Sequence, residues 1–239
     1  MNTHLKIFMT IACGLLAMLF AGPAFSVPIN LIPNGGFELG NTQFGSDYTF
    51  SPASNTAESQ YTVRTNPFPW NPFFISAGDH TSGSGNLFVG NGAPVNQRVW
   101  FSSGISVTPS TDYFFEAWVM NVCCNPDFGQ GNNPVNPAVL SFYANDVLLG
   151  TRSTNLLGVW EGLSTTWNSG AFTSADLELR NSNFVAQGND FGTDDIFLGI
   201  QSTVTSVPEP SSVVLLMSGV VGLALAAMRR ANRNRSCKS

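Results

Sequence analysis

Carboxylates are the most abundant side chains here that could do chemistry. Between residues 27 and 206 there are fourteen Asp and Glu residues, four arginines and no lysine, which gives a net charge near −10. Such a surface cannot neutralise a row of phosphates, so nucleic acid is excluded as a partner. Divalent cations or neutral glycans suit it better. Fourteen acids offer many pairs for a glycosidase reaction, but no pair is singled out by its position.

The usual motifs of other catalytic sites are missing. His80 is the only histidine beyond the first 26 residues. The sequence has no Gly-x-Ser-x-Gly, no His-Glu-x-x-His and no phosphate-binding loop. We therefore expect a protein that is not an enzyme and has no catalytic residues.

The adjacent cysteines Cys123 and Cys124 open an irregular segment that runs to residue 137. Adjacent cysteines can close a ring disulfide, remain a dithiol or cross-link two chains, but they cannot join distant segments. A loop of this length is typically functional or disordered.

A glycan site would need exposed aromatic rings beside polar side chains. Aromatic residues within strands more often belong to the core. Trp70 lies in a proline-rich segment (residues 66–72) and is the least strand-like candidate, so we predict ligand binding by Trp70 and Trp160. The full set of candidates is Trp70, Phe73, Phe74, Trp100, Trp160 and Trp167.

These residues must be positioned by strands, because no convincing helical periodicity occurs between the two termini. Short apolar or alternating runs are separated by turn residues, and the strongest is 113–120. The pattern predicts an all-β fold, a jelly-roll β-sandwich. The main expected strands are 86–89, 97–101, 104–107, 113–120, 138–144, 147–150, 159–167, 175–181 and 194–198.

In the last expected strand, Asp194 shares a face with Ile196 and Leu198. Strand alternation therefore points Asp194 inward and leaves Asp195 outward, so the Asp194 carboxylate needs a partner. That partner could be loop amides, an arginine or a metal ion.

Both termini carry targeting features. Residues 1–26 have a basic start, an apolar stretch and small residues before a cleavage site after Ser26, with Ala24 as the alternative, which is typical of a secretory signal peptide. Residues 204–239 form a tail with an apolar run at about 211–228, long enough for a single transmembrane helix, and a basic end at 229–235. The arginines predict a cytoplasmic C-terminus. One domain, residues 27–203, lies between these segments.

The tail resembles the PEP-CTERM sorting signal of Gram-negative bacteria. Pro208, Glu209 and Pro210 come first, then the apolar run, then Arg229 and Arg230. The resemblance implies recognition by an exosortase-type membrane protease, an inner-membrane anchor before processing, and later a place at the cell surface or in the extracellular matrix of a biofilm. An ordinary tail anchor is the alternative.

The domain resembles exported jelly rolls of the galactose-binding-like type, including carbohydrate-binding modules and MAM domains. Three segments carry this resemblance: residues 34–38 (NGGFE), 78–85 (GDHTSGSG) and 188–196 (GNDFGTDDI). It implies a structural Ca²⁺ that joins the first strand region, the following loop and the last strand. The implied ligands are Glu38, Asp79, Thr81 and Asp194.

The sequence is compatible with three functions. We expect an exported surface or matrix protein that binds polysaccharide without catalysis. The second possibility is a structural or adhesive protein without a ligand site. The third is a glycan-active enzyme, which would place two inward carboxylates across an open cleft.

Overall fold

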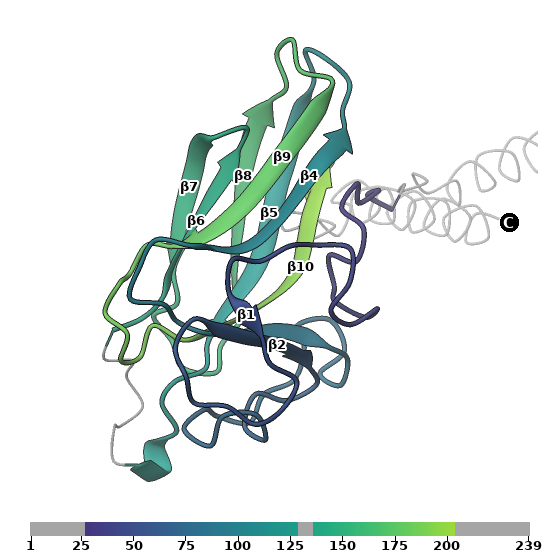
Figure 1. The fold of residues 1–239 in the computed structure, drawn as a ribbon. Helices are drawn as coiled ribbons and strands as arrows, with labels where there is room; N and C mark the ends of the chain where they lie inside the picture. Colours follow the sequence, from purple (N-terminus) through teal and green to yellow (C-terminus); the bar gives the residue numbers. More distant parts are fainter. Residues whose placement is uncertain (1–26, 129–135, 204–239) are drawn as a thin grey trace, which may run out of the picture. The chain divides into compact units, whose positions relative to one another are not determined.

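The computed structural model describes residues 27–128 and 136–203 (Figure 1). Here the chain forms ten strands and a short 3-10 helix, Pro126–Phe128. No helix within these ranges is long and apolar enough to cross a membrane. The expected signal peptide and transmembrane helix both lie outside the described residues. Pro28–Thr205 forms a compact unit.

The strands form two sheets, so the prediction of an all-β sandwich is confirmed. The larger sheet has the order β1-β2-β3-β10-β5-β8, and the smaller has the order β4-β9-β6-β7. The larger sheet contains β1 (Thr49–Phe50), β2 (Gln60–Arg64), β3 (Leu87–Asn91), β5 (Asp112–Asn121), β8 (Glu161–Asn168) and β10 (Phe191–Gly199). The smaller contains β4 (Arg98–Ser106), β6 (Val139–Ala144), β7 (Val147–Ser153) and β9 (Ser174–Asn181).

The main core lies between the two sheets. Phe115 of β5 meets Phe142 of β6 with ring centroids 5.2 Å apart. A second apolar cluster lies on the opposite face of the larger sheet, because Leu87 and Val89 alternate with the core residue Phe88 along β3. Trp70, from the proline-rich segment, and Phe74, just after it, belong to this second cluster.

Most expected strands are present, with one correction. Residues 97–101 and 104–107 belong to a single strand, β4. Its pairing with β9 shifts between Ser102 and Ile105, and Gly104 has a φ of 72°, so the glycine makes a bulge and does not end the strand. The predicted β6–β7 hairpin is confirmed, and its turn residues Asn145 and Asp146 both have positive φ.

The N-terminal segment packs along β10. The Ile196 amide donates to the Gly35 carbonyl at 2.9 Å, and the Leu31 amide donates to the Leu198 carbonyl at 2.8 Å. A Cβ at Gly35 would lie 2.0 Å from the Ile196 carbonyl oxygen, so only glycine fits. This close approach places Glu38 beside the last strand.

Candidate functional site

The four residues predicted to hold a cation meet around one cavity of about 410 Å³. Glu38, Asp79, Thr81 and Asp194 all line it, together with Asp195. The first loop, the loop before β3 and the last strand therefore converge as expected. Within the described residues, however, no three carboxylate, histidine or cysteine side chains are arranged as a group that could hold a metal ion.

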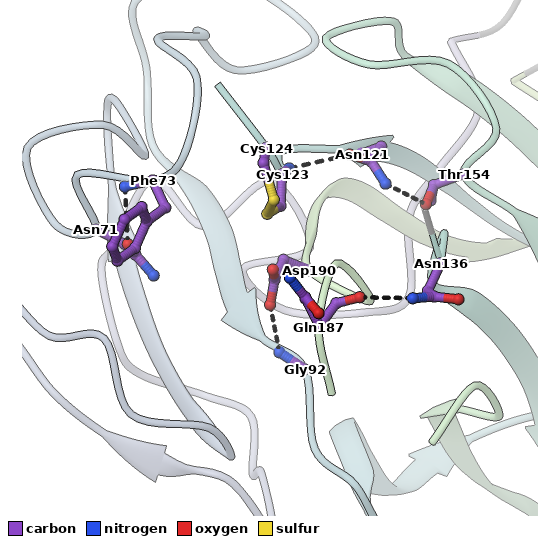
Figure 2. The surroundings of a disulfide bond; sticks show 10 residues. All are labelled: Asn71, Phe73, Gly92, Asn121, Cys123, Cys124, Asn136, Thr154, Gln187 and Asp190. Atoms are coloured by element: carbon purple, nitrogen blue, oxygen red, sulfur yellow. Dashed lines mark hydrogen bonds between the residues drawn. A yellow bond between two sulfur atoms is a disulfide. The ribbon is translucent and has the colours of Figure 1, made fainter. Parts of the chain in front are cut away.

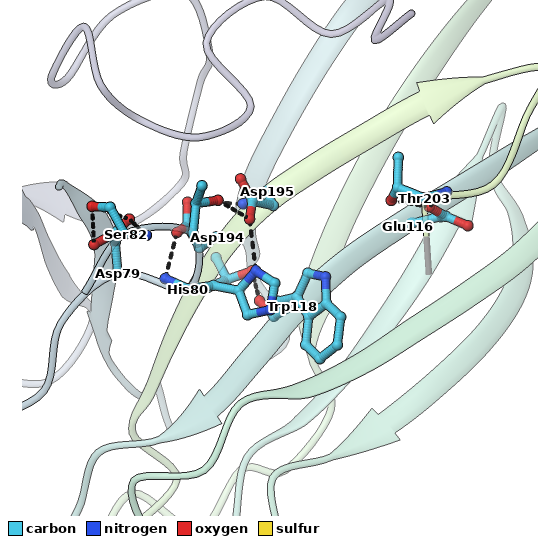
Figure 3. A network of polar contacts seen from close by, with 10 residues as sticks. Asp79, His80, Ser82, Glu116, Trp118, Asp194, Asp195 and Thr203 are labelled. Atoms are coloured by element: carbon cyan, nitrogen blue, oxygen red, sulfur yellow. Dashed lines mark hydrogen bonds and ion pairs between the residues drawn. The ribbon is translucent and has the colours of Figure 1, made fainter. Parts of the chain in front are cut away.

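Asp79 organises the loop before β3 (Figure 3). One of its oxygens accepts hydrogen bonds from the Gly85 amide at 2.7 Å and the Ser82 hydroxyl at 2.9 Å, and the other accepts from the Ser82 amide at 2.8 Å. Burial alone would raise the pKa of Asp79, but the bonds from Ser82 and Gly85 lower it below its ordinary value. Asp79 is therefore held as a carboxylate by its own loop.

Asp194 is 1% exposed, which confirms that it points inward. Its oxygens accept from the amides of His80 at 2.9 Å and Asp195 at 2.8 Å. Burial, and then the nearby charge of Asp195, raise the pKa of Asp194 to about 8. One loop amide and the amide of the next strand residue thus provide the partners that the inward position of Asp194 required.

Asp195 does not follow the expected alternation. It has a φ of 47° and lies where the pairing of β10 with β5 is irregular, so it lines the same cavity as Asp194. Its carboxylate lies 2.7 Å from Nδ1 of His80 and accepts from the Thr81 hydroxyl at 2.6 Å. Sequence reasoning missed Asp195 because a bulge brings neighbouring side chains to one site.

Another buried carboxylate, that of Glu116 in β5, accepts several hydrogen bonds away from this cavity. It accepts from the Ser164 hydroxyl at 2.6 Å, from the Thr203 amide at 2.8 Å and hydroxyl at 2.5 Å, and from the Ser202 hydroxyl. Burial would raise its pKa, but these bonds lower it. Glu116 therefore fixes the end of the domain (Figure 3).

A different cavity, also of about 410 Å³, lies beside the adjacent cysteines (Figure 2). Cys123 and Cys124 are joined by a disulfide, which resolves the alternatives left open by the sequence. The Cys123 amide donates to the Asn121 side chain at 2.9 Å, and Cys123 pairs with Phe74 in an isolated β-bridge. The two cysteines form part of a cavity wall.

The other walls combine amides, an aromatic ring and two acids. Phe73 is 47% exposed. The buried Asn71 accepts a hydrogen bond from the Phe73 amide at 3.0 Å and so shapes this corner. The lining residues are Thr56, Glu58, Asn71, Phe73, Phe74, Asn91, Cys123, Cys124, Ala186, Gln187, Gly188 and Asp190.

Asp190 and Glu58 are the two acids of this cavity. Asp190 is 4% exposed and accepts from the Gly92 amide at 2.8 Å. Burial raises the pKa of Asp190 to about 8, with a further contribution from the charge of Glu58. Glu58 is exposed at the rim, yet the surrounding protein removes enough water to raise its pKa to about 7. The sequence offered no signal that would single out this pair among fourteen acids.

The two tryptophans predicted to bind a ligand do not lie in this cavity. Trp70 is 0% exposed, and its indole donates to the Ser51 carbonyl at 3.0 Å, so the expectation of an exposed ring is wrong. Its loop folds back onto the outer face of the larger sheet, which buries the ring. Trp160 is half-buried beside His80, whose ring stacks on Trp118 with centroids 3.9 Å apart.

Residues 206–230 match the PEP-CTERM protein-sorting motif. The chain carries a PEP-CTERM sorting tail. Pro208, Glu209, Pro210, Arg229 and Arg230 fall within the matched residues, which are outside the described part of the structure. The motif marks the protein as exported and membrane-anchored before processing.

Solved structures similar to this chain include the three that follow, and no curated protein matches it. The sugar-binding EclA C-terminal domain is 15% identical, with 42% of this chain and 66% of that chain covered and a TM-score of 0.35. A family 16 carbohydrate-binding module is 14% identical, with coverage of 71% and 99% and a TM-score of 0.42. A cyclase from Fischerella sp. TAU is 16% identical, with coverage of 74% and 100% and a TM-score of 0.47. These similarities are too low to carry a function over to this chain. A function for either cavity must therefore be inferred from the residues that line it.

The raised pKa of Asp190 predicts a stability that falls as pH rises. Its carboxyl has an ordinary pKa of 3.8 and a folded-state pKa of about 8, so the folded protein binds this proton more tightly than the unfolded chain. Between these two values the free energy of unfolding should fall by up to ~1.4 kcal/mol per pH unit for this group. Asp190→Asn should remove that contribution, as measured by urea unfolding at a series of pH values.

Asp194 has a similar shift and should keep its own slope in the Asp190→Asn variant. The control is Asp146→Asn on the exposed β6–β7 turn, which should leave the wild-type profile unchanged. If Asp190→Asn and wild type gave the same pH profile, Asp190 would not be a protonated acid in the folded protein.

Proposed function

We propose that this protein binds polysaccharide, without catalysis, in the cavity beside Cys123 and Cys124. The exposed ring of Phe73 at the edge of this cavity is the observation that carries the proposal. Sugar rings present apolar C–H faces and a rim of hydroxyls, so a site for them needs an aromatic face next to polar side chains. Here the polar side chains are Asn71, Asn91 and Gln187.

The absence of catalysis is inferred from the two acids of the cavity. An acid–base pair works when the environment pushes its two pKa values apart, so that one group is ionised and the other protonated. Here the surroundings raise the pKa of both Glu58 and Asp190. At acidic pH both carboxyls would be protonated, and neither would be the ionised nucleophile or base that glycoside hydrolysis requires, which supports a binding role.

The cell-surface setting of this binding follows from the tail. An exosortase-type membrane protease would process the PEP-CTERM segment and release the domain to the cell surface or extracellular matrix of a Gram-negative bacterium. An exopolysaccharide of that matrix would be the ligand. The burial of Trp70 is the one observation that favours the other candidate, a structural or adhesive protein without a ligand.

Phe73→Ala should weaken oligosaccharide binding about tenfold, which corresponds to ~1.4 kcal/mol for a lost aromatic contact. The measurement is a glycan array on the full-length chain in mild detergent, followed by titration of each oligosaccharide that binds. Phe68→Ala is the matched control, because Phe68 lies in the same loop with 42% exposure but does not line the cavity. Equal affinities in the two variants would contradict the site, and no binding to any glycan would favour the structural candidate.

We further propose that a structural Ca²⁺ occupies the cavity of Glu38, Asp79 and Asp194, with oxygens of the Thr81 region completing the ligands. Several carboxylates line this small space and no arginine does, so a cation would offset their mutual repulsion. The burial of Asp194 beside Asp195 supports the same assignment. The ion would join the first loop to β10.

Calcium should then raise the melting temperature and a chelator should lower it. At a concentration about a hundredfold above Kd the gain is ~2.7 kcal/mol, or roughly 5–10 °C for a domain of this size. Glu38→Gln should remove most of the shift, whereas Asp146→Asn should keep it. A melting temperature that does not respond to calcium or chelator would refute the cation.

A further inference from the structure

The cavity beside the disulfide has acidic side chains but no basic ones. Glu58 and Asp190 line it, and none of the four arginines of the described residues does. Three of those arginines form ion pairs outside the cavity: Arg98 with Asp47, Arg152 with Glu161 and Arg180 with Glu178. Whatever binds here therefore meets two acids without a cation supplied by the lining residues.

Asp190 also presents a polar atom that has no partner. Its Oδ1 accepts from the Gly92 amide, and its other oxygen makes no hydrogen bond to any described residue. Figure 2 shows the bonded oxygen facing Gly92 and the second oxygen turned away from it. The residue is 4% exposed and lines the cavity, so this second oxygen is held in place and open to a ligand that brings a donor.

The two acids of the cavity favour a ligand whose hydrogen-bond donor is positively charged. Burial makes both carboxyls resist ionisation, as their raised pKa values indicate. A ligand hydroxyl supplies only a dipole, whereas an ammonium group supplies a full charge and three N–H donors, which can replace the proton on an acid of the pair. The exposed Phe73 ring nearby is a further favourable surface for a cation.

We propose that this cavity selects amino sugars, meaning sugar units with a free protonated amine, over neutral and N-acetylated units. The proposal rests on the carbohydrate binding proposed above and names its substrate class. Glu58 and Asp190 would be the residues that determine specificity, and the aromatic and amide walls would hold the sugar ring.

Three β-1,4-linked tetramers that differ only at C2 test this directly: cellotetraose with a hydroxyl, the N-acetylglucosamine tetramer with an acetamide, and the glucosamine tetramer with an amine. Isothermal calorimetry on the full-length chain in mild detergent, at mildly acidic pH, should give at least about tenfold tighter binding of the glucosamine tetramer. In buffers of different ionisation enthalpy, only that tetramer should release protons, because the ammonium displaces a carboxyl proton.

Glu58→Gln and Asp190→Asn should each reduce this preference, and the double variant should bring the three affinities to within about twofold. Asp146→Asn removes one acid outside the cavity and should keep the preference. Equal binding of all three tetramers would overturn the amine selection and leave carbohydrate binding standing. A preference that persists in the double variant would also overturn it, and binding of none of the tetramers would count against both proposals.

Discussion

Strand β10 is the element on which both cavities depend. It pairs with β3 on one edge and β5 on the other, and all but one of its residues are buried. Asp190 lies directly before it, and Asp194 and Asp195 lie at its irregular step. Because β10 is buried within the sandwich, the carboxyl groups of Asp190 and Asp194 are both shielded from water, each beside a different cavity. The raised pKa values of Asp190 and Asp194 are a consequence of this burial.

The buried acids of the domain differ in how completely they are bonded. Glu116 accepts from two residues that immediately precede the sorting tail and from Ser164, so it acts as a structural anchor. Asp194 is bonded by the His80 amide of the loop before β3 and by the amide of its strand neighbour Asp195. Asp190 has only the Gly92 amide and faces a cavity. Asp190 therefore keeps bonding capacity toward the cavity, whereas Glu116 has used its own within the domain.

Local patterns predicted much of the fold, because alternation and turn residues act within a few positions. The β6–β7 hairpin with Asn145 and Asp146 and the inward Asp194 are examples. The errors came from contacts between distant segments. Trp70 is buried because its loop folds onto β3 and β5, and the bulge at Asp195 depends on pairing with β5. The bond from Gly92 to Asp190 joins residues 98 positions apart, which no local pattern reveals.

We propose above that the cavity walled by Cys123 and Cys124 holds the sugar. A crystal structure of the protein soaked with the glucosamine tetramer tests it most directly. We expect a sugar ring against Phe73, with its amine directed at Asp190 and Glu58. Sugar density on the His80, Trp118 and Trp160 face, with the disulfide cavity empty, would contradict it.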